Sequence, residues 1–540
     1  MWTLLRSNGT DVTRFSVDPG GPGDYVGGVL RRARWCVVLA VVACGPGGRH
    51  GGGDGGGSGS ADAGPTDLCH VHDDDTGNAV PVCTDHAPPN AFEPDIQWTW
   101  TGATEPYSIV TPLVANLTDD NGDGEINLCD TPDIVVVAAG PGDGQPSLVG
   151  HIYLLNGATG AEELMIPTAV DSSVTPALGD LDHDGVPDIV TTDTSGHIYA
   201  FDHTGAVMFG PGDVWGGTTA AGTVPWYSGA IALADLDHDG HVEIIGGNSV
   251  WNDQGHLLWT AATSEANWNA TTAADLDGDG MMEVVLGHAA YHHDGTLAWM
   301  TNLQPGYPQV ANLDSDPEPE ILLTNNDGLA VIEHDGTVKY SAKRPTGDAV
   351  GFDTWLRPAT VHDFDGNGTA EYAMSSANNY TTYNADATIR WMAPVSDQSG
   401  IAAGTAFDFL GDGHAEAMYA DEQFMYVFGD QGQVLLKTAR TSGTLTEYPV
   451  VADVDNDGSA EIVVVSNMYQ TASPTVQVIR DKMDRWIQAR RIWNQHTYHV
   501  TNVREDGTIP TNEAPSWQRL NTFRTNAQIN GAGVCTPVIL

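Results

Sequence analysis

Acidic residues recur along this chain at a spacing that suits the binding of a hard divalent cation. In the repeated pattern D-x-D-x-D-G-x-x-[DE], acids alternate with other residues, a glycine follows, and a further acid closes the loop. Calcium takes about six to eight oxygen ligands, and alternate residues of a tightly curled loop can direct their oxygens at one centre. The glycine permits the sharp turn with positive φ that such a loop needs. This spacing therefore predicts calcium binding.

Five copies match the pattern closely. A single copy would be weak evidence, because D-x-D-G sequences also form ordinary turns with solvated aspartates. Repetition in register along most of the chain favours metal binding over that alternative. The candidate metal-binding residues of these copies are Asp180, Asp182, Asp184 and Asp188; Asp235, Asp237, Asp239 and Glu243; Asp275, Asp277, Asp279 and Glu283; Asp363, Asp365, Asn367 and Glu371; and Asp453, Asp455, Asp457 and Glu461.

Three further copies depart from the pattern, so a solvated turn is as good an interpretation as a metal site. One has Pro317 where the glycine belongs, one has Leu410 in place of the middle acid, and one, beginning at Asn116, contains extra residues. Their weaker candidate residues are Asp119, Asn121, Asp123 and Asp133; Asn312, Asp314, Asp316 and Glu320; and Asp408, Asp412 and Glu416.

The elements that position these loops read as β-strands. Each loop lies between apolar runs of strand length, and a second hairpin follows, often with an Asp-Gly turn such as Asp294-Gly295. Two hairpins give four strands per unit, and units start near 116, 180, 235, 275, 312, 363, 408 and 453. This pattern predicts an all-β fold, a β-propeller of eight four-stranded blades, or seven if one unit closes another. Each calcium loop is expected in the first hairpin of its blade, and the double hairpin argues against a β-sandwich array.

The composition excludes two other classes of protein. The 540 residues include 71 Asp and Glu against 21 Lys and Arg, a formal net charge of -50. A surface this acidic repels phosphate, so we expect no nucleic-acid partner. A disordered acidic chain is excluded by 41% hydrophobic residues with 15 Trp and 16 Tyr. Clustered carboxylates also repel one another unless a cation lies among them.

The N-terminal region reads as an export signal. In residues 31–44 a basic cluster precedes a short apolar run that ends at Cys44. The last four residues of this run resemble a bacterial lipobox, which predicts lipidation of Cys44. Residues 45–64 are almost entirely Gly, Ser, Ala and Asp, which favours a flexible tether. We expect an exported protein, either an outer-membrane or cell-surface lipoprotein held to the membrane only by its lipid, or a secreted protein.

These patterns divide the chain into five parts. They are residues 1–44 (N-terminal extension with the signal and lipobox), 45–64 (tether), 65–104 (a lead-in), 105–488 (the propeller) and 489–540 (a C-terminal extension that packs on or closes the propeller). Export would leave four cysteines, which allow three pairings. One expectation is Cys69 with Cys83 and Cys129 with Cys535.

At these loops and hairpins, over roughly residues 105–480, the chain resembles the FG-GAP or VCBS repeat family, whose calcium loops are similar to those of the integrin α-subunit propeller. The resemblance implies several bound calcium ions. It also implies that loop positions one, three, five and nine coordinate calcium, with a backbone carbonyl at position seven. The segment from Ala489 to Arg524 resembles the C-terminal extension of many bacterial FG-GAP repeat proteins.

No catalytic motif stands out. The chain contains no G-x-S-x-G elbow, no phosphate-binding Walker loop and no Cys–His arrangement. His496 and His499 lack an acidic third ligand at a suitable spacing, so we expect them to be structural. The favoured function is a non-catalytic, calcium-stabilised binding or adhesion module with a protein or glycan ligand at the cell surface. The alternatives are a structural component of the cell envelope and a polysaccharide lyase, for which Arg357 and Arg390 are among the few basic residues that could face an acidic sugar.

Overall fold

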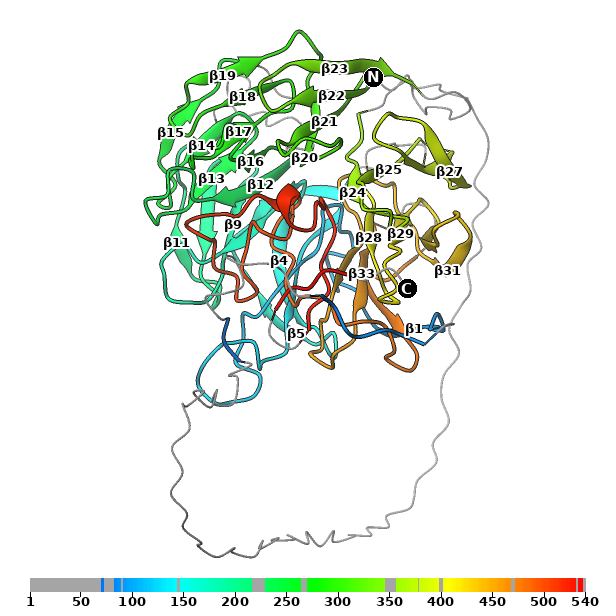
Figure 1. The fold of residues 1–540 in the computed structure, drawn as a ribbon. Coiled ribbons are helices and arrows are strands. Elements are labelled where there is room, and N and C mark those ends of the chain that lie inside the picture. The colour runs from blue at the N-terminus through cyan, green and yellow to red at the C-terminus, as the bar shows by residue number, and fades with distance from the viewer. Residues whose placement is uncertain are drawn as a thin grey trace, which may run out of the picture. The chain divides into compact units, whose positions relative to one another are not determined.

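The chain forms a β-propeller of eight blades, which confirms the predicted fold (Figure 1). The computed structural model describes residues 69–71, 82–88, 91–142, 146–215, 229–263, 270–344, 356–376, 378–397, 402–467, 472–530 and 533–537. All of these belong to the unit Pro65–Leu540. Cys44 and the predicted tether lie outside the described residues.

Each blade is an antiparallel sheet whose first three strands follow one another in the chain. Blades 1 to 4 contain β2 (Leu113–Ala115), β3 (Asp133–Pro141), β4 (Pro146–Asn156) and β5 (Glu162–Met165); β8 (Ala177–Gly179), β9 (Asp188–Thr192), β10 (Ile198–Phe201) and β11 (Val207–Phe209); β12 (Gly229–Ala234), β13 (Glu243–Gly246), β14 (Ser249–Trp251) and β15 (Leu257–Thr260); and β16 (Thr272–Ala274), β17 (Glu283–Val285), β18 (Ala289–Tyr291) and β19 (Leu297–Met300).

Blades 5 to 8 continue the same order. They contain β20 (Gly306–Ala311), β21 (Glu320–Asn325), β22 (Gly328–Glu333) and β23 (Val338–Lys343); β24 (Thr360–His362), β25 (Glu371–Ser375), β26 (Asn379–Tyr383) and β27 (Ile389–Pro394); β28 (Thr405–Phe407), β29 (Glu416–Ala420), β30 (Phe424–Phe428) and β31 (Val434–Ala439); and β32 (Val450–Ala452), β33 (Glu461–Val465), β34 (Val476–Asp481) and β1 (Pro94–Trp100). Two short strands extend blades 1 and 3: β6 (Val170–Asp171) pairs with β4, and β7 (Val174–Thr175) pairs with β12.

Burial orders the strands from the centre of the ring to its rim. The first strands of the blades, such as β8 and β32, are buried along their whole length. The fourth strands, such as β15 and β19, are largely exposed. Apolar residues therefore concentrate between neighbouring blades and toward the centre, where they stabilise the ring by removing apolar surface from water.

The eighth blade joins the two ends of the propeller. Its first three strands come from the end of the repeat region, but its outer strand is β1, which pairs with β34 from Pro94↔Asp481 to Trp100↔Val476. This strand lies before residue 105, where the sequence places the start of the propeller. The Trp98 indole donates a 2.6 Å hydrogen bond to the carbonyl of Gly157 in blade 1. The ring is thus closed by strand pairing and by a contact to the next blade.

Aromatic residues of the outer strands connect neighbouring blades. The Trp259 indole of blade 3 donates to the His293 carbonyl of blade 4 at 2.8 Å, and Trp299 of blade 4 donates to the His334 carbonyl of blade 5 at 2.7 Å. A Cβ added to Gly295 would lie 2.7 Å from the Trp259 ring, and this glycine has φ +81°. The Asp-Gly turns therefore need glycine both for their backbone conformation and for the close approach of the next blade.

Residues 489–530, here called the central segment, run through the middle of the ring, where Figure 1 shows the orange-to-red end of the chain. Hydrogen bonds connect it to the first strand of every described blade, or to the residue beside that strand. In order from blade 1 to blade 8, they join Trp493 to Val114, Asn494 to Leu178, Gln495 to Leu233, Thr497 to Thr271, Asn521 to Asn312, Phe523 to Val361, Arg524 to Thr405, and Asn526 to Val451. A short 3-10 helix, η3 (Ser516–Gln518), lies within this segment.

Two disulfides hold the ends of the described chain. Cys69 pairs with Cys129 and Cys83 pairs with Cys535, with Cα–Cα distances of 4.9 and 5.0 Å. The expected pairings of Cys69 with Cys83 and of Cys129 with Cys535 are both wrong. Residue 82 forms a bridge with Thr536, which brings Cys83 beside Cys535. Disulfides persist in oxidising compartments, which is consistent with an exported protein. Within the part of the chain that the structure describes, no helix is long and apolar enough to cross a membrane.

Candidate metal-binding loops

The acidic loops all occupy the same place in their blades. Each one connects the first strand to the second, and the acid that closes it is the first residue of the second strand. Since every described blade has the same strand order, the loops lie on one face of the ring. The closing acids are Asp133, Asp188, Glu243, Glu283, Glu320, Glu371, Glu416 and Glu461.

The loop of blade 2 shows how the sequence pattern produces the curl. Asp180 accepts hydrogen bonds from the backbone N–H groups of Asp184 and Gly185, each at 3.1 Å, and Gly185 has φ +89°. One carboxylate oxygen of Asp188 accepts the N–H of Leu181 at 2.9 Å. The same closing hydrogen bond, from the second loop residue to the closing acid, recurs in every described blade. This hydrogen bond uses one oxygen of the closing acid, and the partner of the other oxygen differs between blades.

Loop aspartates come close together in blades 2, 3 and 4. In each of these sets, one oxygen from every residue lies within 4.8 Å of the others, which is close enough for the set to hold a metal ion. The sets are Asp180, Asp182 and Asp188; Asp235, Asp237 and Asp239; and Asp275, Asp277 and Asp279. Oxygen-only donor sets suit hard cations better than soft transition metals.

Burial and mutual repulsion raise the pKa values of the closing acids. For both Asp188 and Glu243, burial first and neighbouring loop aspartates second raise the pKa to about 8. The pKa of Glu461 lies well above its usual range for the same reasons. Among the described residues, neither Oε1 of Glu461 nor Oδ1 of Asp455 has a hydrogen-bond partner, although both atoms are buried. A buried acceptor without a partner is costly, so these oxygens fit a cation in the loop of blade 8.

The loop of blade 4 includes a nitrogen donor that the sequence pattern does not contain. Nδ1 of His292 lies 2.9 Å from Oε1 of Glu283, and together with Asp277 these residues form a further group that could hold a metal ion. His292 follows β18, so it reaches the loop from the neighbouring hairpin. In blade 7, Asp408 accepts the N–H groups of Asp412 and Gly413 at 3.1 and 2.8 Å, so this loop keeps its curl despite Leu410.

The loop of blade 1 contains an inserted loop of its own. Asp119 accepts the N–H groups of Gly122 and Gly124 at 2.7 and 3.0 Å. Asp130 accepts the N–H groups of Asp120 and Asn121 at 3.1 and 3.2 Å. From Asp119 to Asp130 the acids and Gly124 follow the twelve-residue spacing of an EF-hand calcium loop, in which the twelfth residue is the closing acid.

In the structure, the predicted residues of blade 1 belong to two different loops, the inserted loop and the regular blade loop. Asp119, Asn121 and Asp123 belong with Asp130, which the sequence interpretation left out of the site, while Asp133 closes the regular blade loop by accepting the Leu117 N–H at 2.9 Å. The glycine followed six residues later by an acid was the signal that could have identified Asp130.

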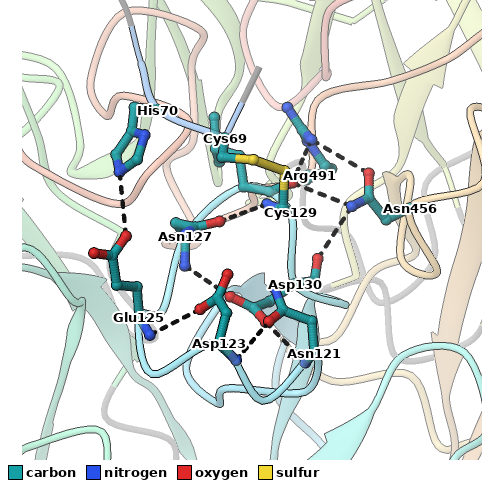
Figure 2. Close-up of a disulfide and its surroundings, with 11 residues drawn as sticks. Cys69, His70, Asn121, Asp123, Glu125, Asn127, Cys129, Asp130, Asn456 and Arg491 are labelled. Atoms are coloured by element: carbon teal, nitrogen blue, oxygen red, sulfur yellow. Dashed lines mark hydrogen bonds and ion pairs between the residues drawn. A yellow bond between two sulfur atoms is a disulfide. The ribbon is translucent and has the colours of Figure 1, made fainter. Parts of the chain in front are cut away.

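The inserted loop is fastened to the rest of the molecule by the Cys69–Cys129 disulfide (Figure 2). Asn456, from the loop of blade 8, donates to the carbonyl oxygens of Leu128 and Asp130 at 3.1 and 3.2 Å. The inserted loop is therefore held both by a covalent bond and by the neighbouring blade.

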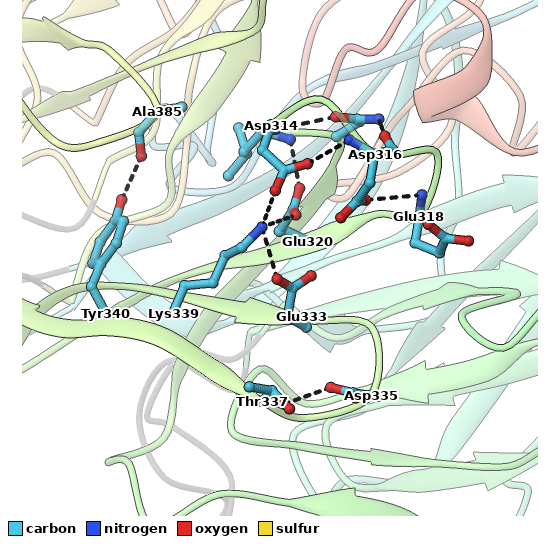
Figure 3. Close-up of polar contacts among 12 residues, drawn as sticks. Asp314, Asp316, Glu318, Glu320, Glu333, Asp335, Thr337, Lys339, Tyr340 and Ala385 are labelled. Atoms are coloured by element: carbon cyan, nitrogen blue, oxygen red, sulfur yellow. Dashed lines mark hydrogen bonds and ion pairs between the residues drawn. The ribbon is translucent and has the colours of Figure 1, made fainter.

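Blades 5 and 6 have a basic side chain among their loop carboxylates. In blade 5, Nζ of Lys339 contacts Asp314, Glu320 at 2.5 Å and Glu333 at 2.8 Å (Figure 3). The hydrogen bond from Lys339 is the main reason that the pKa of Asp314 lies below its usual value. The carboxylates of this loop therefore have a cationic partner from the same chain.

The guanidinium of Arg390 makes the corresponding contacts in blade 6. Its nitrogens lie 2.6 Å from Oδ2 of Asp365 and 2.7 Å from Oε1 of Glu371. Burial raises the pKa of Asp365, but the hydrogen bond and charge of Arg390 outweigh burial and leave this pKa below its usual value. The sequence interpretation counted this loop among the five close matches and did not connect Arg390 with it.

The other singled-out residues lie in buried networks. Arg357 is fully buried and donates to the Ser375 hydroxyl at 3.2 Å. In the central segment, Nε2 of His499 lies 2.6 Å from Oε1 of Glu513. His496 is buried, and burial followed by the charge of Arg524 holds its pKa well below the usual range. These placements agree with structural roles for both histidines.

No protein-family model matches the chain, and no curated protein matches it in sequence. Its structure is similar to that of the V. cholerae biofilm matrix protein Bap1, with a TM-score of 0.69 and 23% identity over 83% of this chain and 100% of that one. A rhamnogalacturonan lyase of Bacillus licheniformis matches with a TM-score of 0.48 and 18% identity over 83% of each chain. The likeness to Bap1 shows the fold, a β-propeller.

Proposed function

We propose that this protein is a calcium-stabilised, non-catalytic binding module that acts outside the cell on a glycan or protein ligand. The observation that carries the proposal is the repetition of carboxylate loops on one face of the ring, with a buried oxygen of Glu461 that has no partner among the described residues. Calcium in these loops would offset the repulsion between their carboxylates and fix the loop conformations that a ligand meets.

Calcium is the metal that the donor sets favour. The carboxylate groups in the loops of blades 2 and 3 contain only oxygen donors, at the spacing that the FG-GAP and VCBS resemblance associates with calcium. The inserted loop from Asp119 to Asp130 adds a second type of calcium loop. Both types use backbone N–H groups to orient their first acid, as in blade 2 and in the insertion.

The placement of Arg357 and Arg390 favours binding over lyase chemistry. Arg357 is fully buried, and Arg390 is bonded to two loop carboxylates, so both side chains are engaged within the protein. The similar solved structure is named as a biofilm matrix protein, which supports an extracellular location. Two disulfides support export, and lipidation of Cys44 would make the protein a cell-surface lipoprotein.

The test combines binding and turnover on the full-length chain. Glycan and protein arrays are probed with calcium and again with excess chelator, and pectic substrates are incubated with the protein while ultraviolet absorbance is followed. We expect saturable, calcium-dependent binding without a rise in absorbance. A steady rise in absorbance would instead establish a lyase, and binding that is unaffected by chelation would overturn the role of calcium.

A further inference from the structure

The outer strand of every described blade contains a β-bulge at the same position. In blade 5, Ile332 pairs with Val338 and Val331 pairs with Tyr340, so Lys339 is the extra residue between the two pairs. Bulges commonly re-aim a side chain. The equivalent bulge residues of blades 1 to 8 are Glu163, Met208, Leu258, Ala298, Lys339, Arg390, Leu435 and Gln97.

Where the bulge residue is polar, it contacts the acidic loop of its own blade. Lys339 and Arg390 bind loop carboxylates in blades 5 and 6. In blade 8, Nε2 of Gln97 donates to Oδ2 of Asp455 at 2.6 Å. In blade 1, Glu163 accepts the Thr118 hydroxyl hydrogen bond at 3.1 Å. In blades 1, 5, 6 and 8, the bulge therefore places a polar side chain of the outer strand beside the acidic loop.

In blades 5, 6 and 8, the charge of the bulge residue determines whether Oε1 of the closing acid has a partner within the blade. In blade 8, where the bulge residue is neutral, Oε1 of Glu461 has no hydrogen-bond partner among the described residues. In blade 5 the corresponding oxygen of Glu320 lies 2.5 Å from Lys339, and in blade 6 that of Glu371 lies 2.7 Å from Arg390. The oxygen that is available to bind a metal ion in blade 8 is therefore bonded to a positively charged side chain in blades 5 and 6.

We propose that Lys339 and Arg390 are built-in cations that replace the metal ion in blades 5 and 6, so that the bulge residue, together with the loop motif, decides which loops bind metal. A divalent ion in either loop would have to displace the resident positive charge or lie next to it. The loop of blade 6 therefore binds no metal although it matches the motif from Asp363 to Glu371. This inference rests on the proposed function insofar as it assumes that other loops bind calcium.

The test measures how many calcium ions the full-length chain binds, by equilibrium dialysis against radioactive calcium. Arg390→Met introduces the residue that blade 2 has at this position, and we expect it to bind one more ion than the wild type. Arg390→Lys keeps the charge and should leave the number unchanged. Met208→Lys transplants a cation into blade 2, next to the loop that starts at Asp180, and should remove one ion.

The outcomes separate this inference from the proposed function. A wild type that binds no calcium overturns the proposed function. A wild type that binds calcium overturns only this inference if Arg390→Met gains no ion and Met208→Lys loses none. If Arg390→Met folds in calcium but not in chelator, the result supports the inference, since the metal then replaces the lost guanidinium. If that variant folds in neither condition, the stoichiometry of Met208→Lys decides.

Discussion

Replacing Glu461 by glutamine should change the stability of the protein in opposite directions with and without calcium. Glu461 is fully buried, one of its oxygens accepts the Val454 N–H at 3.0 Å, and the other has no partner among the described residues. The variant keeps the shape of the side chain. Its amide stays uncharged and can donate to a neighbouring loop carboxylate, whereas the native side chain repels that carboxylate whenever it is ionised and avoids this only by taking up a proton.

The two effects differ in size. In chelator, relief of a buried acceptor without a partner should stabilise the variant by about 1–3 kcal/mol. In calcium at about 1,000 times Kd, the wild type gains about 4 kcal/mol from one site, which the variant loses. The variant should then be less stable than the wild type by about 1–3 kcal/mol. For a cooperative unit of roughly 450 residues, 1 kcal/mol corresponds to about 1 °C in Tm.

Differential scanning calorimetry of both proteins in excess calcium and in excess chelator measures these shifts. The matched control is Glu371→Gln in blade 6, where the equivalent oxygen is bonded to Arg390. That variant should lose about 1–3 kcal/mol in both conditions, because a charge-assisted hydrogen bond is removed whether or not calcium is present. If Glu461→Gln lowers Tm equally in calcium and in chelator, the reasoning about an orphaned metal ligand is refuted.

Three other perturbations have defined outcomes. In chelator, the free energy of unfolding should fall as pH rises from about 5 to 8. Burial raises the folded-state pKa values of Asp188 and Glu243 to about 8, so in this range the folded state binds more protons than the unfolded state and loses that advantage as pH rises. Urea titrations measure this fall, and the same titrations in calcium should show none. Trp493→Ala should lower the free energy of unfolding by about 3–5 kcal/mol in calcium and in chelator alike, because this fully buried ring lies at the centre of the blades. Urea unfolding measures the loss, and a loss that depends on calcium would contradict this expectation. Replacing Cys83 and Cys535 by serine should cost about 2–4 kcal/mol and speed proteolysis, and unchanged digestion would argue against that disulfide.

The number of blades could be predicted because its signals are local. Each acidic loop spans about nine residues, and each Asp-Gly turn two, so both are visible in a short window of sequence. The strand bounds in the structure follow these signals closely. Glu243 and Glu283, for example, are both the closing acids of the pattern and the first residues of β13 and β17.

The closure of the ring could not be predicted, because it depends on residues that are far apart in the chain. Strands β1 and β34 are paired although almost all of the propeller's sequence lies between them, and the two cysteines of the Cys83–Cys535 disulfide are 452 residues apart in the chain. No spacing rule selects these partners. The central segment is similar in this respect, since its hydrogen bonds pair residues such as Trp493 and Val114 that share no motif.

The same distinction explains why a loop that matches the calcium motif need not bind calcium. The motif of blade 6 ends at Glu371, yet the residue that neutralises it, Arg390, comes two strands later and reaches the loop only because a bulge turns it there. In blade 5 the separation between Asp314 and Lys339 is 25 residues. A search for acidic loops counts carboxylates, whereas metal binding depends on the net charge of the folded site. The residue at the outer-strand bulge is therefore needed to predict from sequence which of these loops bind metal.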